Sequence, residues 1–225
     1  MALSVSTDKL SWQGALLGGF IGFLLFTGAG YTGVAMIAAF FFLGTAATSW
    51  KTTFKERSGL AEANKGRRTA AQVIANAGVP AILAFVAWTY PSKAELCRIM
   101  MAAGFAAATA DTLSSELGNV YGRRFYNILT FKKDTRGLNG VVSLEGSLSG
   151  MIGAAIIAGI YAIGFGWNTA FLWIIIAGTI GNITDSILGA TVERKHFLNN
   201  NQVNFLNTLI AALAALLIYW IDSRF

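Results

Sequence analysis

The sequence contains little charge. Asp, Glu, Lys and Arg make up 12% of its 225 residues, whereas a typical soluble domain carries about a quarter. Hydrophobic residues make up 55%, and the mean hydropathy is +0.57. So few charged side chains cannot cover the surface of a water-soluble protein. The length suits one compact domain, so we expect a single transmembrane domain over residues 1–225.

Histidine and cysteine each occur once. Cys97 alone can form neither an intramolecular disulfide nor a CxxC metal site. His196 alone argues against a histidine zinc site and against a Ser-His-Asp triad. The sequence also lacks a GxxxxGK[ST] motif, which excludes a P-loop enzyme. Any chemistry must therefore rely on carboxylates, amides, hydroxyls and basic side chains.

Apolar segments recur along the whole chain. They cover residues 10–26, 33–50, 72–90, 99–113, 141–165, 168–189 and 203–221. Most approach the ~20 residues that a helix needs to cross the hydrocarbon core. The fourth is weak because Asp111 and Glu116 lie at its end. Backbone groups in lipid must be hydrogen-bonded within their own segment, so we predict an all-α, polytopic bundle of about seven transmembrane helices.

The basic residues predict one orientation. With seven crossings, 14 of the 17 Lys and Arg residues fall on one side, and only Lys93, Arg98 and Arg224 fall on the other. The positive-inside rule then places the N-terminus in the cytoplasm and the C-terminus outside. We expect the plasma (inner) membrane of a prokaryote, with membrane lipid as a partner. Basic loops bind anionic lipid heads, and no nucleic-acid-binding module is visible, so we expect no nucleic acid partner.

Two glycine series have the four-residue spacing of helix-packing faces. Gly14, Gly18 and Gly22 follow one another in the first segment, and Gly146 and Gly150 in the fifth. Small residues at this spacing allow close helix approach in lipid, so we interpret both series as packing surfaces.

Four acids lie within or at the ends of apolar segments: Asp111, Glu116, Glu145 and Asp185. Ionisable groups there are costly, and they usually face a cavity or a partner and mark function. The predicted topology brings all four toward the cytoplasmic face. The alternative is that a neighbouring basic residue holds each acid for structural reasons. Asp111 and Glu116 would point about 140° apart on a straight helix, so they converge on one ligand only if that helix breaks.

The surroundings of these acids are polar and small. In the sixth segment Gly178, Gly181, Asn182, Asp185, Ser186 and Gly189 share one helical face, as expected for a helix that lines a cleft. Asn76 in the third segment extends the same cleft in this interpretation. Carboxylate, amide and hydroxyl oxygens suit Mg²⁺, which takes one or two carboxylates together with substrate phosphates.

Four stretches of the sequence carry a family resemblance. They are GRRTAAQVIAN at residues 66–76, DTLSSELG at 111–118, NGVVSLEGS at 139–147 and DSILGAT at 185–191. In this order they resemble the signatures of the phytyl phosphate kinase and transmembrane protein 19 family, also known as domain of unknown function 92. The resemblance covers residues 55–191, and a more distant one extends to dolichol and phytol kinases and lipid cytidylyltransferases.

The resemblance implies an Mg²⁺-dependent kinase. It would transfer the γ-phosphate of CTP or another nucleoside triphosphate to an isoprenoid monophosphate, such as phytyl or geranylgeranyl phosphate, and so yield the diphosphate. The catalytic candidates are Asp111, Glu116, Asp185 and Glu145, of which the first three would ligate Mg²⁺. The candidates for binding phosphate or base are Arg67, Arg68, Asn76, Ser115, Arg123, Arg124, Lys132, Lys133, Asn139, Ser143 and Asn182. A site facing the cytoplasm is expected.

Three other functions stay open from the sequence. A lipid cytidylyltransferase would release pyrophosphate, and a polyprenol kinase would phosphorylate an alcohol. A small transporter would use the intramembrane acids as a cation or proton path, although transporters usually place such sites near the bilayer midplane within inverted repeats. The sequence also leaves open whether the chain forms a homodimer.

Overall fold

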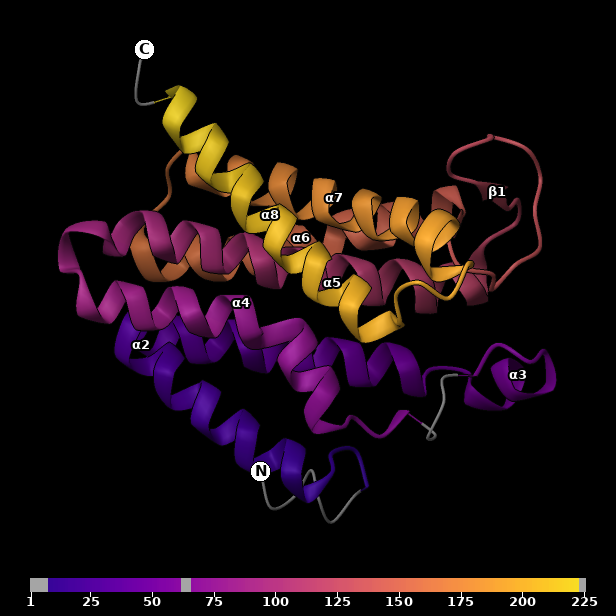
Figure 1. The fold of residues 1–225 in the computed structure, drawn as a ribbon, viewed down its shortest axis with the longest axis horizontal. Coiled ribbons are helices and arrows are strands. Elements are labelled where there is room, and N and C mark those ends of the chain that lie inside the picture. The colour runs from indigo at the N-terminus through magenta and orange to yellow at the C-terminus, as the bar shows by residue number, and fades with distance from the viewer. Residues whose placement is uncertain (1–7, 62–65, 223–225) are drawn as a thin grey trace.

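The computed structural model describes residues 8–61 and 66–222 and is almost entirely helical (Figure 1). The α-helices are α2 (Trp12–Ser49), α3 (Thr52–Arg57), α4 (Ala70–Thr89), α5 (Ala94–Tyr121), α6 (Leu144–Phe165), α7 (Ala170–Leu188) and α8 (Asn200–Asp222). A 3₁₀ turn, η2 (Pro91–Lys93), precedes α5, and a π turn, η3 (Gly189–Glu193), ends α7. The strands β1 (Tyr126–Asn127) and β2 (Val141–Val142) pair antiparallel. Lys65 and Arg224 lie outside the described residues.

Helix α2 turns back on itself at Gly30. This glycine has φ 60° and ψ −151°, a conformation that interrupts the helix and that glycine adopts at little cost. Nζ of Lys9, before the first arm, donates to Oγ of Ser49 at the end of the second arm, 3.0 Å away. The two arms therefore form a hairpin and correspond to the first two predicted segments (Figure 1).

The polytopic helical architecture is confirmed. Six helices of the described chain are long and apolar enough to cross a membrane. Because α2 supplies two arms, residues 8–61 and 66–222 contain seven apolar helical arms, in agreement with the seven predicted segments. The large apolar side chains on the outside of the bundle, such as Phe42 and Ile163, are exposed, as expected for side chains that face lipid.

Helix α5 forms the centre of the bundle. It packs against α2, α4, α6, α7 and α8, and every residue from Met101 to Ala110 is buried. Alanine and glycine permit this crowding: a Cβ on Gly178 would lie 2.7 Å from Cβ of Ala106. The central position explains the weak hydropathy of the fourth segment. A helix surrounded by protein can carry polar groups that a lipid-facing helix cannot.

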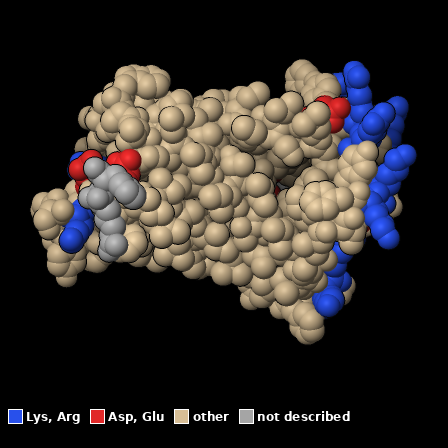
Figure 2. Space-filling view, turned by 90° about the horizontal axis from the view of Figure 1, so that it is seen from above, with Lys and Arg blue, Asp and Glu red and all other residues tan. Residues whose placement is uncertain are grey.

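Basic side chains gather at one end of the molecule, and the visible face is hollowed close to that end (Figure 2). Helix α3 and the segment 122–143, which contains β1 and β2, lie at this end (Figure 1). The side of the membrane that this end faces stays a prediction.

Candidate functional site

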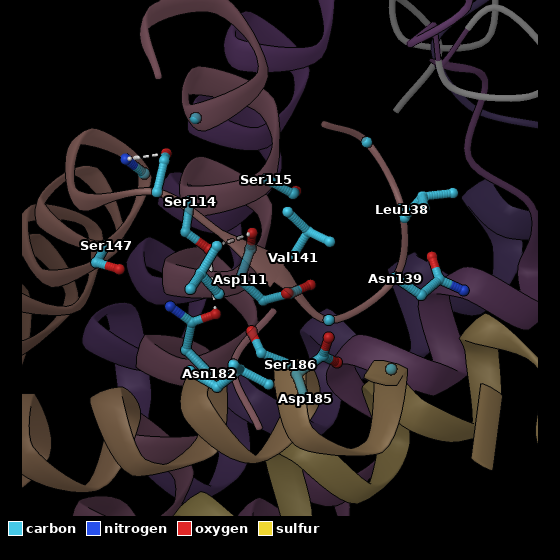
Figure 3. Close-up of a pocket in the computed structure, with 18 of the residues that line it drawn as sticks. Asp111, Ser114, Ser115, Leu138, Asn139, Val141, Ser147, Asn182, Asp185 and Ser186 are labelled. Atoms are coloured by element: carbon cyan, nitrogen blue, oxygen red, sulfur yellow. Dashed lines mark hydrogen bonds between the residues drawn. The ribbon is translucent and has the colours of Figure 1, made fainter. Parts of the chain in front are cut away.

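A polar pocket of about 190 Å³ opens at the basic end of the bundle. Helices α5 and α7, the first turn of α6 and the segment 122–143 form its walls (Figure 3). Six of the predicted site residues line it: Asp111, Ser115, Asn139, Ser143, Asn182 and Asp185. The structure thus brings together residues from three of the four motif stretches.

Asp111 and Asp185 form the acidic part of the pocket. They project from α5 and α7, and their side chains are close enough to share a hydrogen bond (Figure 3). Oδ1 of Asp185 is buried and has no hydrogen-bond partner among the described residues. Arg68 lies close enough to Asp111 to interact with it electrostatically. Two adjacent carboxyl groups with a spare buried oxygen favour a cation or a shared proton between them.

Hydroxyl and amide groups continue from these acids. Oγ of Ser114 donates to Oδ1 of Asn182, 3.1 Å away, which links α5 to α7 beside the acids. A Cβ on Gly150 of α6 would lie 2.9 Å from Nδ2 of Asn182, so the glycine leaves the room that this amide occupies. Ser115 faces the pocket from α5, and its hydroxyl donates to the carbonyl of Thr112. The pocket wall is therefore rich in oxygen atoms.

The segment 122–143 is held against the end of α7. Oδ2 of Asp134 accepts from Nη2 of Arg194 at 2.9 Å, and the carbonyl of Asn139 accepts from Nε of the same arginine at 2.6 Å. The backbone N–H of Thr135, followed by Arg194 and Asn127, lowers the pKa of Asp134 below its usual range. Gly140 has φ +73°, and a Cβ there would collide with the backbone of Ala190. This contact places Asn139 and Gly140 at the pocket wall.

Ser143 has a structural contact as well as its place in the pocket. Its Oγ accepts from the backbone N–H of Gly146, 3.1 Å away, and so caps α6. The helix therefore begins at Leu144, whereas the predicted segment began at residue 141. Gly146 packs against α5, where its Cβ would lie 2.6 Å from the carbonyl oxygen of Ser114.

Glu116 does not join Asp111 and Asp185. Its Oε2 pairs with Nζ of Lys55 from α3, and it does not line the pocket. The straight α5 keeps the wide angular separation from Asp111 that the sequence implies. Glu145, in the first turn of α6, lies outside the pocket lining too, and its Oε2 accepts from the backbone N–H of Arg123 at 3.4 Å.

None of the predicted basic residues, all of which lie in the described part of the chain, lines the pocket. Arg123, Arg124, Lys132 and Lys133 are exposed on the segment 122–143. Arg67 pairs with Asp8 at 3.4 Å. Arg68 is buried between α2 and α5, and its guanidinium lies 5.0 Å from the ring centroid of Phe40. Asn76 is also buried, and its Nδ2 donates to the carbonyl of Gln72 within α4.

Residues of α8 and of the turn before it were missed by the sequence interpretation. Glu193 and Asn200 line the pocket, and Asn207 lies beside Asp185. Asn207 is 1% exposed, and neither atom of its amide has a hydrogen bond of standard geometry within the described chain. Asn200, Asn204 and Asn207 follow helical spacing at the start of an apolar segment, and this signal would have identified the face.

The acidic pair can supply part of the coordination shell that Mg²⁺ requires. Within residues 8–61 and 66–222, no group of three His, Cys, Asp or Glu side chains can hold a metal ion. Asp111 and Asp185 supply two carboxylates, and one buried oxygen of Asp185 has no hydrogen-bond partner in the described part of the chain. Mg²⁺ commonly takes one or two carboxylates and completes its shell with waters and phosphates, so this pair is a suitable donor set.

Comparison with known proteins identifies a family of integral membrane proteins and several similar membrane proteins. The family model described as "Integral membrane protein DUF92" matches residues 1–212. The protein "VTE6, chloroplastic" of Arabidopsis thaliana is 34% identical over 92% of this chain, which spans 65% of that protein. An uncharacterised membrane protein of Synechocystis is 31% identical over 87% of this chain and 77% of its own length. An uncharacterised membrane protein of Methanocaldococcus jannaschii is 30% identical over 97% of this chain and 90% of its own length. No solved structure matches.

Proposed function

The chain belongs to the integral membrane protein family DUF92, and from this premise and the pocket we propose that it is a prenyl phosphate kinase. The reaction transfers the γ-phosphate of a nucleoside triphosphate to an isoprenoid monophosphate. The observation that carries the proposal is the Asp111–Asp185 pair at the end of the bundle, within a wall of serine and asparagine side chains.

The position of the pair suits a reaction between a soluble and a lipid substrate. Asp111 and Asp185 belong to apolar helices, whereas Asn139 and Gly140 belong to a segment outside them. A nucleotide can approach from the basic end, where Arg123, Arg124, Lys132 and Lys133 are exposed. Basic side chains attract the triphosphate and neutralise its charge. The isoprenoid chain can stay among the helices or in lipid.

Positioning and charge neutralisation carry out most of a phosphoryl transfer. An oxygen of the prenyl phosphate attacks the γ-phosphorus, the bond from this phosphorus to the β–γ bridging oxygen breaks, and the nucleoside diphosphate leaves. The attacking oxygen is already ionised at neutral pH, so the site needs no strong general base. The single histidine, His196, lies outside the pocket lining.

Each part of the pocket has a role in this reaction. Asp111 and Asp185 would hold Mg²⁺, which neutralises phosphate charge when bound. Ser114, Ser115 and Asn182 orient the phosphates by hydrogen bonds. The exposed loop arginines and lysines bind the nucleotide at the pocket entrance. In this scheme Glu116 and Ser143 support the fold of the site, since both have structural partners.

The finer assignments follow the family resemblance of the four motif stretches. We propose CTP as donor, phytyl or geranylgeranyl phosphate as acceptor, and a site that faces the cytoplasm of a prokaryotic plasma membrane. Purified protein should convert prenyl monophosphate to diphosphate when supplied with a nucleoside triphosphate and Mg²⁺. Label from the γ-position of CTP should enter the lipid.

A matched measurement separates this function from its alternatives. If label from the α-position enters the lipid and pyrophosphate appears, the protein is a cytidylyltransferase. If prenyl alcohols are phosphorylated and monophosphates are not, it is a polyprenol kinase. Either result, or a lack of transfer with every nucleotide and prenyl phosphate in a panel, would contradict the proposal.

A further inference from the structure

A second cavity lies inside the first helical hairpin. It has a volume of about 380 Å³ and is bounded by both arms of α2 and by the start of α4. Most of its lining is apolar, including Ile37, Phe41 and Val73, and its polar side chains are Arg68 and Gln72. Gly19 and Phe42 on its rim are exposed, so the cavity is a groove open to the surface that faces lipid.

The glycine series of the first arm lines this groove. Gly14, Gly18 and Gly22 belong to its wall. Gly14 does pack closely, since its Cβ would lie 3.4 Å from the backbone nitrogen of Ala70. A Cβ on Gly22 would meet no atom of the described residues within 4 Å, so that glycine leaves open space. Gly14 and Gly22 are eight residues apart, which makes the groove about 12 Å long at 1.5 Å per residue.

The polar end of the groove approaches the pocket. Arg68 is 8% exposed, lies over the ring of Phe40, and packs against Gly44 and near Thr112. Thr112 follows Asp111 on α5, and Arg68 interacts electrostatically with Asp111 itself. On α5, Ser115 and Asn119 lie at angles between those of Asp111 and Thr112, and both line the pocket. The side of α5 that Arg68 approaches is therefore next to the side that lines the pocket.

We propose that this groove binds the isoprenoid chain of the phosphate acceptor, with Arg68 at the end where the phosphate lies. The proposal rests on the prenyl phosphate kinase function proposed above. An apolar groove with one buried guanidinium at its inner end matches an amphiphile with a phosphate head and a hydrocarbon tail. The tail runs from Arg68 toward Gly22, and the head faces Ser115 and Asp111. The groove takes the first isoprene units, and the rest of a long chain extends into lipid.

Filling the groove should change the preference for chain length. Gly22→Leu adds a side chain in the far half of the groove, where no atom must move to admit its Cβ. We expect the KM for geranylgeranyl phosphate to rise roughly tenfold, which corresponds to about 1.4 kcal/mol. The KM for dimethylallyl phosphate, whose tail ends near Arg68, should stay unchanged. Gly159→Leu is the matched control, because a Cβ on this α6 glycine also meets none of the described atoms within 4 Å.

A binding measurement tests the groove without relying on turnover. Full-length protein in nanodiscs is irradiated with geranylgeranyl monophosphate that carries a diazirine in its second isoprene unit. Labelled peptides should come from residues 10–42 and 68–77, and Gly22→Leu should reduce this labelling while Gly159→Leu does not. Unlabelled geranylgeranyl phosphate should compete better than geranylgeraniol or lysophosphatidic acid.

The outcomes separate the groove from the kinase function. Labelling of these peptides in a protein that transfers no phosphate would support the groove and contradict the kinase. Transfer with labelling confined to other helices would overturn the groove and leave the kinase intact. Equal competition by lysophosphatidic acid would identify a general lipid site and overturn the proposal. Equal effects of Gly22→Leu and Gly159→Leu on labelling would overturn it as well.

Discussion

Nζ of Lys55 pairs with Oε2 of Glu116 in the interior of the basic end. The lysine side chain is 1% exposed and the glutamate side chain 12%. The same Nζ donates to the carbonyls of Ala47 at 3.0 Å and Thr48 at 2.6 Å, in the last turn of α2. Lys55 therefore satisfies the end of α2 and joins it to α5, and Glu116 neutralises the buried charge.

Breaking this pair should destabilise the protein. Lys55→Met removes the buried ammonium that pairs with Glu116 and donates to the carbonyls of Ala47 and Thr48, and we expect a loss of about 3–5 kcal/mol in the free energy of unfolding. The double variant Lys55→Met/Glu116→Leu should regain most of this loss, because it removes both charges. Thermal unfolding of the purified protein in detergent measures the effect. A Glu116→Gln protein that unfolds like the unmodified one but loses phosphate transfer would place Glu116 in the catalytic site.

Acid should release the segment 122–143 from α7. The backbone N–H of Thr135, followed by Arg194 and Asn127, holds the pKa of Asp134 below its usual value in the folded chain, so these contacts stabilise the fold above pH ~4. This contribution is lost as the pH falls through the lowered pKa. The melting temperatures of the unmodified protein and of Asp134→Asn should therefore differ at pH 7 and converge in acid. A difference that persists at pH 2 would show that the carboxylate charge is irrelevant.

The contact between Gly140 and Ala190 should be disrupted by a single methyl group on Gly140. Gly140→Ala faces both a positive φ and a collision with the α7 end, so it should displace the wall that carries Asn139. Gly59→Ala is the control, since Gly59 has φ +67° and its Cβ would meet no atom of residues 8–61 and 66–222 within 4 Å. The control should cost about 1 kcal/mol of stability, as for a left-handed residue. Gly140→Ala should cost more and also raise the KM for nucleotide, and equal effects of both changes would refute the contact.

The predicted orientation can be tested with two cysteines. Lys133→Cys lies in the segment at the basic end, and Ser92→Cys lies in η2 between α4 and α5. In a background of Cys97→Ser, an impermeant maleimide applied to intact cells should label position 92 and leave position 133 unlabelled. Labelling of both positions from outside would contradict seven passes with a cytoplasmic basic end.

Much of the fold was predictable because lipid imposes simple rules. The apolar segments match the described helices, and the doubling of α2 follows from the two stretches on either side of Gly30. The sequence did not predict that α5 is the central helix. Helix α5 tolerates a low hydropathy because protein, rather than lipid, surrounds it. The sequence of the segment alone does not reveal which neighbours surround the helix.

The candidate site was predictable only where helical spacing agrees with packing. Asp111, Asn182 and Asp185 meet because α5 and α7 lie in contact. Glu116 shows the limit, since the pairing with Lys55 joins residues that are 61 positions apart. Asn207 is a site residue that the sequence interpretation missed. Its role beside Asp185 depends on how α8 packs, and its spacing from Asn200 and Asn204 was the available signal.

The most direct test of the account measures phosphate transfer by Asp111→Asn, Asp185→Asn and the double variant. Glu95→Gln, at the exposed start of α5, is the control. Because the two carboxylates act as a unit, each single change should lower kcat about 100-fold or more, and the double change should lower it little further. Folding, followed by thermal unfolding, should persist in all of them. Near-normal transfer by both single variants, with the fold intact, would contradict a shared site at Asp111 and Asp185.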